Sequence, residues 1–126
     1  MDKAQAIQNW LEGYLPAYDQ YTVKPDAQMP YITYALSLGV FDATTDLTVS
    51  VWYRTASWQA VTEKSSEIIS DLASAPGILL RTDDGAIRLL PGQPAMLRMN
   101  DPDDDMVRRT VLNIMVRDYT AAKRKE

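Results

Sequence analysis

Cysteine and histidine are both absent from the 126-residue sequence. Without cysteine, the chain can form neither a disulfide bond nor a thiolate metal site. Without histidine, it lacks the commonest general base, the commonest neutral metal ligand and the usual partner of a nucleophilic serine. Carboxylates, lysines and tyrosines can still carry out chemistry. These absences nevertheless favour a protein that is not an enzyme.

Glycine-rich loops and long apolar runs are also lacking. The sequence has five glycines and no Gly-x-Gly-x-x-Gly or P-loop pattern, so a phosphate-binding loop is not supported. No apolar run approaches the roughly 20 residues of a membrane span. The N-terminus is too polar for a signal peptide. We therefore expect no cofactor and no membrane partner, and a protein that is made and used in a cytoplasm.

Basic residues are outnumbered, with 13 Lys and Arg against 17 Asp and Glu and a net charge of −4. Because phosphate neutralisation supplies much of the affinity of a DNA-binding protein, specific nucleic-acid binding is not expected, although a local basic patch can hide within the total. The content of 46% hydrophobic residues is typical of a soluble fold with a core. We predict one domain over residues 1–120 and a charged, frayed tail over 121–126.

Two segments, residues 3–16 and 57–75, have apolar residues at the three-to-four spacing of a helix. Asp2 is the predicted N-cap of the first helix and Pro16 its predicted end. Ser57 is the predicted N-cap of the second. The two apolar stripes consist of Ala4, Ile7, Leu11 and Tyr14, and of Trp58, Val61, Ser65, Ile68 and Leu72.

The remaining segments alternate between apolar and polar residues, as strands do. Residues 30–38 and 47–54 flank a short polar turn at 42–46, which predicts an antiparallel hairpin. Residues 17–28 are polar and are predicted to form a loop. The first strand pair is therefore expected to follow this loop directly.

A second group of strands is predicted after the second helix. Residues 78–81 and 86–90 flank an Asp-Gly turn at 83–85, which is a strong hairpin signal. Pro91–Pro94 is expected to break the pattern before two further strands, 95–99 and 107–119. The element order is α-β-β-α-β-β-β-β. We therefore predict an α+β fold, with a mainly antiparallel sheet and two helices packed on one face.

The densest charge cluster contains four aspartates: Asp101, Asp103, Asp104 and Asp105. Asp101, Asp103 and Asp105 alternate with other residues, as the first ligands of a calcium-binding loop do. The sixth position, however, is Met106 instead of glycine, and the twelfth is Leu112 instead of glutamate. The two other interpretations are a solvated turn between strands and a loop that repels a passing polyanion.

Trp52 lies on the nominally polar face of its predicted strand. A large aromatic side chain there either covers a second layer or marks an interface, and packing beneath a helix is the alternative. Together with Trp58, Arg108 and Arg109, it forms our set of candidate subunit-interface residues. A solvated strand surface is the alternative for the two arginines.

Three stretches resemble the tail terminator and tail-completion proteins of long-tailed bacteriophages. The first is the strand Met29-Pro30-Tyr31-Ile32-Thr33-Tyr34. The second is the strand Leu47-Thr48-Val49-Ser50-Val51-Trp52-Tyr53-Arg54. The third is the helix that opens at Ser57-Trp58. The resemblance covers nearly the whole chain in the order of its elements.

This resemblance implies a structural virion protein without enzymatic activity or cofactor. Such proteins form rings, commonly hexamers, that cap the tail tube and join the tail to the head. The implied partners are further copies of the chain, the tail tube protein and the head-completion or connector protein. The implied location is the tail–head interface of the virion, assembled in the host cytoplasm. The acidic loop at 101–105 would then face the DNA channel, where like charge reduces sticking.

Three alternatives remain open at this stage. One is another neck or minor tail component of similar build. A second is a small oligomeric ligand-binding module, which requires a concave apolar pocket with convergent polar groups. The third is an enzyme that uses carboxylates and tyrosine, which requires two carboxylates converging in a cleft.

Overall fold

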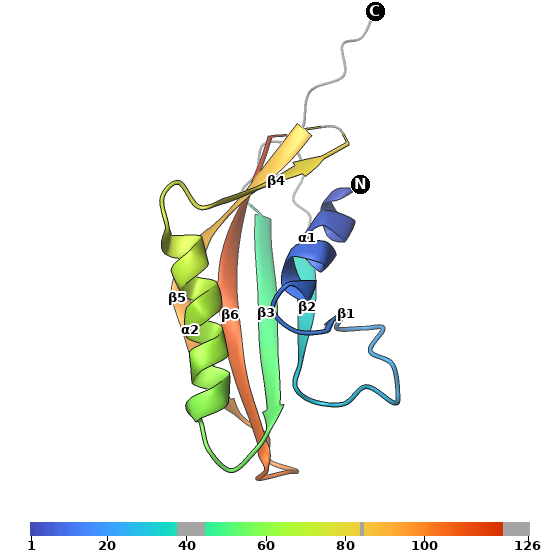
Figure 1. The fold of residues 1–126 in the computed structure, drawn as a ribbon, viewed down its shortest axis with the longest axis vertical. Coiled ribbons are helices and arrows are strands. Elements are labelled where there is room, and N and C mark those ends of the chain that lie inside the picture. Colours follow the sequence, from blue (N-terminus) through green and yellow to red (C-terminus); the bar gives the residue numbers. More distant parts are fainter. Residues whose placement is uncertain (38–44, 84, 120–126) are drawn as a thin grey trace, which may run out of the picture.

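The structure is a computed structural model that describes residues 1–37, 45–83 and 85–119. It confirms the predicted α+β fold, with two helices and a mostly antiparallel six-stranded sheet (Figure 1). The predicted tail at 121–126 lies outside the described residues, as does most of the predicted turn at 42–46. The elements are α1 (Lys3–Glu12), β1 (Ala17–Asp19), β2 (Tyr31–Ser37), β3 (Thr45–Arg54), α2 (Gln59–Ala73), β4 (Ile78–Thr82), β5 (Gly85–Asn100) and β6 (Val107–Asp118).

The strand order is β1-β2-β3-β6-β5-β4. Both predicted hairpins are present, because β2 pairs antiparallel with β3 and β4 pairs antiparallel with β5. The long strands β3 and β6 pair in the centre of the sheet, from Thr45 opposite Val116 to Arg54 opposite Val107. The last strand, β6, therefore lies between β1–β3 from the N-terminal half of the chain and β4 and β5 from the C-terminal half.

One strand was not predicted. Residues 17–19, expected within a loop, form β1, which runs parallel to β2. The Ile32 N–H donates to the Pro16 carbonyl at 2.8 Å, and the Gln20 N–H donates to the Tyr34 carbonyl at 2.9 Å. Three residues are too few for an alternation pattern, so this strand depends on the neighbouring β2 and has no sequence signal of its own.

The predicted break at Pro91–Pro94 is wrong. A single 16-residue strand, β5, runs through it, and its register against β6 shifts between Pro91 and Met96. The Asn113 side-chain amide donates to the Pro94 carbonyl at 2.8 Å. A Cβ atom on Gly92 would lie 2.7 Å from the Asn113 carbonyl oxygen, so only glycine allows this approach. The Pro-Gly signal therefore marks a bulge rather than the end of a strand.

The helices are shorter than predicted. Asp2 caps α1 as expected by accepting the Gln5 N–H at 2.8 Å, but the helix ends at Glu12, four residues before Pro16. In α2 the N-cap position belongs to Trp58 and not to Ser57, although the Ser57 hydroxyl still accepts the Gln59 N–H at 3.1 Å.

Both helices pack on the same face of the sheet, as Figure 1 shows. Ala6, Ile7 and Leu11 are the buried residues of α1, so Ala4, predicted to belong to its apolar stripe, is exposed instead. The Tyr14 hydroxyl, just after α1, donates to Asp71 of α2 at 2.5 Å. Burial and this acceptor both raise the pKa of Tyr14. The largest fully buried side chains are Ile7, Leu11, Ile32, Leu47, Val49, Val51, Ile68, Leu72, Ile87, Leu89, Leu112 and Ile114.

The core contains one buried hydroxyl pair. Ser65 of α2 donates to the Val61 carbonyl at 2.6 Å, and its oxygen lies 2.6 Å from the hydroxyl oxygen of Thr110 in β6. Both residues are fully buried. Because the Ser65 hydroxyl donates its proton to the Val61 carbonyl, the Thr110 hydroxyl must donate to the Ser65 oxygen. This second bond joins α2 to the central strand β6.

We predict that Ser65→Ala lowers the free energy of unfolding by about 1–3 kcal/mol, because Thr110 loses its buried acceptor. Urea denaturation measures this change. The exposed neighbour Ser66→Ala is the control and should stay within about 0.5 kcal/mol of the wild type. Adding Thr110→Val should recover part of the loss, since no hydroxyl is then unpaired. A Ser65→Ala protein as stable as the wild type would contradict this account.

Candidate functional site

The face of the sheet opposite the helices has no helix or strand of the described chain packed on it. Strand register identifies the side chains that share this face. Small polar residues occupy its centre, whereas aromatic, apolar and arginine side chains occupy its ends and the β5 side. The residues are Tyr31, Thr33, Ala35 and Ser37 of β2, Asp46, Thr48, Ser50, Trp52 and Arg54 of β3, Arg88, Leu90, Leu97 and Met99 of β5, and Val107, Arg109, Val111, Asn113, Met115 and Arg117 of β6. We call this surface the uncovered face.

Trp52 and Arg109 lie side by side on the uncovered face. The Trp52 ring lies beneath the Arg109 guanidinium, whose carbon is 4.6 Å from the ring centroid. The indole N–H donates to the Thr33 hydroxyl at 2.9 Å, and the guanidinium donates to the Ser50 hydroxyl at 3.0 and 3.2 Å. Burial lowers the pKa of Arg109, but a guanidinium remains charged at neutral pH. This side chain pair is therefore held in place and half-exposed.

The aromatic surface continues from Trp52 towards β1. The Tyr31 ring lies 6.3 Å from the Trp52 ring, and the Tyr18 ring lies 5.8 Å from Tyr31 in an edge-on arrangement. Packing beneath a helix does not apply to Trp52, because the helices lie on the other face. Rigid aromatic side chains of this kind are typical of protein contact surfaces.

Trp58 and Arg108 lie on the helix side of the sheet instead. Two guanidinium groups flank the Trp58 ring, Arg98 at 5.0 Å and Arg108 at 5.4 Å from its centroid. Arg108 also donates to the Ala56 carbonyl at 2.9 Å and to the Asp105 carbonyl at 2.5 Å. These contacts close the end of the core where α2 begins. The structure thus separates the four candidate interface residues into two pairs on opposite faces.

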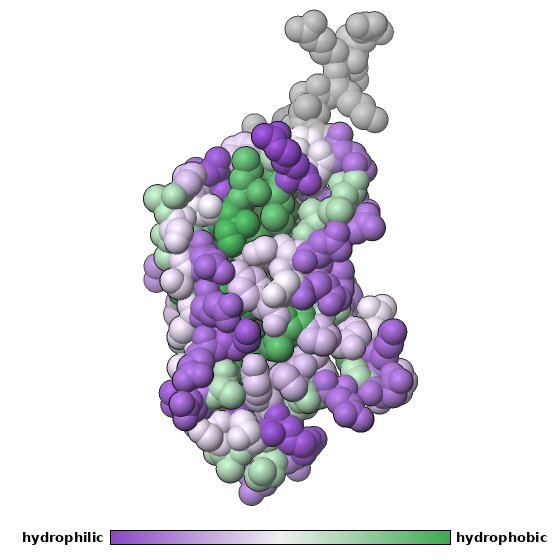
Figure 2. Space-filling model, viewed as in Figure 1, coloured by the Kyte–Doolittle hydropathy of each residue, from purple (hydrophilic) through white to green (hydrophobic). Residues whose placement is uncertain are grey.

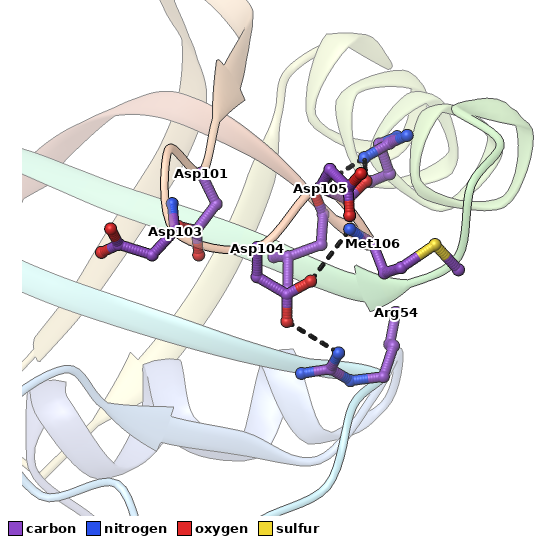
Figure 3. Close-up of polar contacts among 8 residues, drawn as sticks. Arg54, Asp101, Asp103, Asp104, Asp105 and Met106 are labelled. Carbon is purple, nitrogen blue, oxygen red and sulfur yellow. Dashed lines mark hydrogen bonds and ion pairs between the residues drawn. The ribbon is translucent and has the colours of Figure 1, made fainter.

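The four aspartates lie in the loop between β5 and β6, and Figure 3 shows how they are used. Asp101 accepts the Asp103 N–H at 2.9 Å. Asp104 accepts the Met106 N–H at 2.9 Å and pairs with Arg54 at 2.8 Å. Two of the carboxylates therefore stabilise the turn itself. Within the described residues, no group of three or more acidic, His or Cys side chains is arranged to hold a metal ion.

The second half of β5 is an open edge of the sheet, which the sequence analysis missed. β4 covers β5 only from Gly85 to Leu89, whereas β6 pairs with β5 as far as Asn100. Among the described residues, the stretch from Met96 to Asn100 therefore has a strand partner on one side alone. Met96, Leu97 and Met99 are exposed at 36%, 44% and 41%. The available signal was the run of apolar residues on both faces of one predicted strand.

A basic cluster lies near the other end of β6. Arg88 and Arg117 are cross-strand partners, and the Arg88 guanidinium lies 5.7 Å from the Tyr119 ring. The hydrogen bond with Arg88 is the main reason that the pKa of Tyr119 is lowered. Like charges directly opposite each other are unfavourable on a sheet, so this cluster is a local cationic surface on an acidic protein.

The helix side differs from the uncovered face. Figure 2 shows hydrophilic residues along α2 and a hydrophobic patch at the level of β4. Leu79 of β4, which is 45% exposed, lies opposite Arg88 and therefore on the other face of the sheet. Neither helix of the described chain has the length and apolar character needed to cross a membrane.

Comparison with known proteins gives no match, whether to family models, to curated proteins or to solved structures.

The acidic loop leads to a prediction about pH. The Met106 N–H, and then Arg54, lower the pKa of Asp104 below its ordinary value. A lowered folded-state pKa contributes stability above the unfolded pKa of about 4, and this contribution is lost as the pH falls through the folded value. Asp104→Asn should therefore be less stable than the wild type at pH 7 and should converge with it at about pH 2, measured by urea denaturation.

The control for this prediction is Asp103→Asn, because the Asp103 carboxylate makes no hydrogen bond within the described chain. This variant should follow the wild type at both pH values. A difference between Asp104→Asn and the wild type that persists unchanged in acid would show that the carboxylate charge is not its cause.

Proposed function

We propose that this protein is a structural subunit of a bacteriophage tail, either the tail terminator or a closely related head–tail joining protein. In this proposal, copies of the chain form a ring that caps the tail tube and joins it to the head. The resemblance to the phage proteins suggests that the ring has six subunits. The observation that carries the proposal is the sheet itself. One of its faces and one long edge are left without a partner within the described chain, and both bear apolar side chains.

An open apolar edge favours assembly. Natural proteins usually protect an exposed edge strand with charges, prolines or a covering element, because its free N–H and C=O groups pair with other chains. In residues 95–100, the only charged side chain is Arg98. A subunit designed to be covered by neighbours has no need for further protection.

The available surfaces also favour a ring over a two-fold dimer. The uncovered face carries the Trp52–Arg109 pair, whereas the helix side carries hydrophilic residues along α2 (Figure 2). A surface that meets a different surface on its neighbour makes a head-to-tail contact, and such contacts generate rings when the rotation closes.

The sequence motifs behind the resemblance lie next to each other. The strand that begins at Pro30 and the strand that ends at Arg54 are neighbours in the sheet, with Tyr31 opposite Trp52. The tyrosine and the tryptophan both lie on the uncovered face. The motif residues therefore belong partly to the core and partly to a candidate contact surface, which supports a role in assembly.

In this proposal the partners are the tail tube protein and the head-completion or connector protein, and the location is the tail–head interface of the virion. DNA passes through the ring without specific binding. We keep the proposal that the acidic loop faces this channel, since three of its aspartates, Asp101, Asp103 and Asp105, have no ion pair within the described chain.

Deletion of the coding gene from its phage tests the proposed function. We expect tails of uncontrolled length or heads without attached tails in electron micrographs, together with a loss of infectious particles. Complementation with the wild-type gene is the control. Normal infectious particles after deletion would overturn the proposal.

A further inference from the structure

The two lateral sides of the sheet are unlike, and the open edge at 95–100 forms one of them. Figure 1 shows β5 on one side of the molecule and β1, β2 and the segment at 20–30 on the other. The β5 side presents free backbone groups flanked by Met96, Leu97 and Met99. Within this edge Arg98 is the one charged residue, its guanidinium lies over Trp58, and the acidic loop at 101–105 follows directly. The edge itself is therefore apolar with a single cation.

The β1 side is closed to strand pairing by its own chain. β1 has only three residues. The Gln8 side chain donates to the Ala17 carbonyl at 2.7 Å, and the Thr22 N–H donates to the Asp19 carbonyl at 3.0 Å. An incoming strand would have to displace these bonds. Contact on this side must therefore use the segment that extends beyond β1.

The segment at 20–30 projects away from the sheet in Figure 1. Tyr21 is 84% exposed, the highest value among the exposed large hydrophobic residues of the described chain. Asp19 and Asp26 flank it in the sequence, and Lys24 is the one base between them. The projecting segment is therefore aromatic and carries a small excess of negative charge.

We infer that a second copy of this chain docks on the open β5 edge through its projecting 20–30 segment. Tyr21 of the incoming copy covers Leu97 and Met99 on the uncovered face, and the acidic residues of that segment approach Arg98 on the helix side of the edge. The two surfaces match in apolar character, and the single cation of the edge, Arg98, is complementary to Asp26 of the segment. Because they lie on opposite lateral sides of one chain, the contact repeats by rotation from copy to copy. The inference deepens the proposed function and takes its ring symmetry from it.

The absence of cysteine makes this contact directly testable. A double variant with Leu97→Cys and Tyr21→Cys in one chain should give a ladder of crosslinked multimers on mild oxidation, read on a non-reducing gel. Each single variant should give no multimers, because the contact joins two different surfaces. The control pair Leu97→Cys with Ser66→Cys, the latter exposed on α2, should also give none.

Charge and polarity variants provide a second readout. Leu97→Glu and Arg98→Asp should each weaken association at least about tenfold, measured by analytical ultracentrifugation. Adding Asp26→Arg should restore association in the Arg98→Asp background. Arg81→Asp, an exposed charge reversal on β4, is the control and should associate like the wild type. Thermal unfolding confirms that each variant is folded.

The possible outcomes separate this inference from the proposed function. Crosslinked dimers from Leu97→Cys alone would mean that the β5 edge pairs with itself, which overturns the inference. Rings that form normally in Leu97→Glu and Arg98→Asp would also overturn it, while the proposed tail function would stand. Conversely, the expected ladder together with normal particles after gene deletion would support the contact and overturn the function. A wild-type chain that stays monomeric both in concentrated solution and when bound to phage tails would overturn both.

Discussion

Both helices bury their apolar stripes on the same face of the sheet, and the other features of the molecule depend on this one-sided packing. A six-stranded sheet has two faces, but the described chain provides helices for only one of them. Burying each large apolar side chain contributes roughly 1.5–3 kcal/mol, so the covered face supplies most of the stability. The second face has no helix or strand of the described chain packed on it, and it carries the Trp52–Arg109 pair.

The bulge in β5 connects this packing to the open edge. Before the bulge, β5 has β4 on one side and β6 on the other, and its side chains Ile87 and Leu89 enter the core. After the bulge, the strand continues along β6 alone and its side chains are exposed. Gly92 makes this possible, because it allows the close approach to Asn113 that shifts the register. The first half of β5 thus contributes side chains to the core, and its second half forms an exposed edge of the sheet.

Much of the fold was predictable because its signals are periodic. The alternation predicted over residues 47–54 is present in β3, where Leu47, Val49 and Val51 are buried, and the helical spacing correctly predicted Val61 and Leu72 for the apolar stripe of α2. The errors have local physical causes. β1 is too short for a pattern, and the Pro-Gly stretch in β5 has the same composition as a loop while forming a bulge. Composition cannot distinguish these two cases, since the register of the neighbouring strand decides between them.

The candidate contact surfaces were predictable only in part. Alternation placed Trp52 on the face opposite the core side chains of β3, and this is correct. It did not separate Arg108 from Arg109, although adjacent strand residues must point to opposite faces. The structure assigns Arg108 to the helix side, where it packs against Trp58, and Arg109 to the uncovered face. The open edge could not be predicted, because it depends on where β4 ends along β5.

The net charge of −4 conceals local differences in charge that bear on the proposed association. All seven arginines of the described residues lie in β3 to β6, but the same part of the chain also carries Asp46, Asp118 and the four aspartates at 101–105. The difference is therefore one of local patches. Arg88 and Arg117 lie opposite each other on the sheet, whereas Glu63, Glu67 and Asp71 recur every four residues along α2 and are exposed. Patches of unlike sign favour contact with each other and patches of like sign do not. In the proposed ring, such patches would favour a head-to-tail arrangement of identical subunits over a two-fold one.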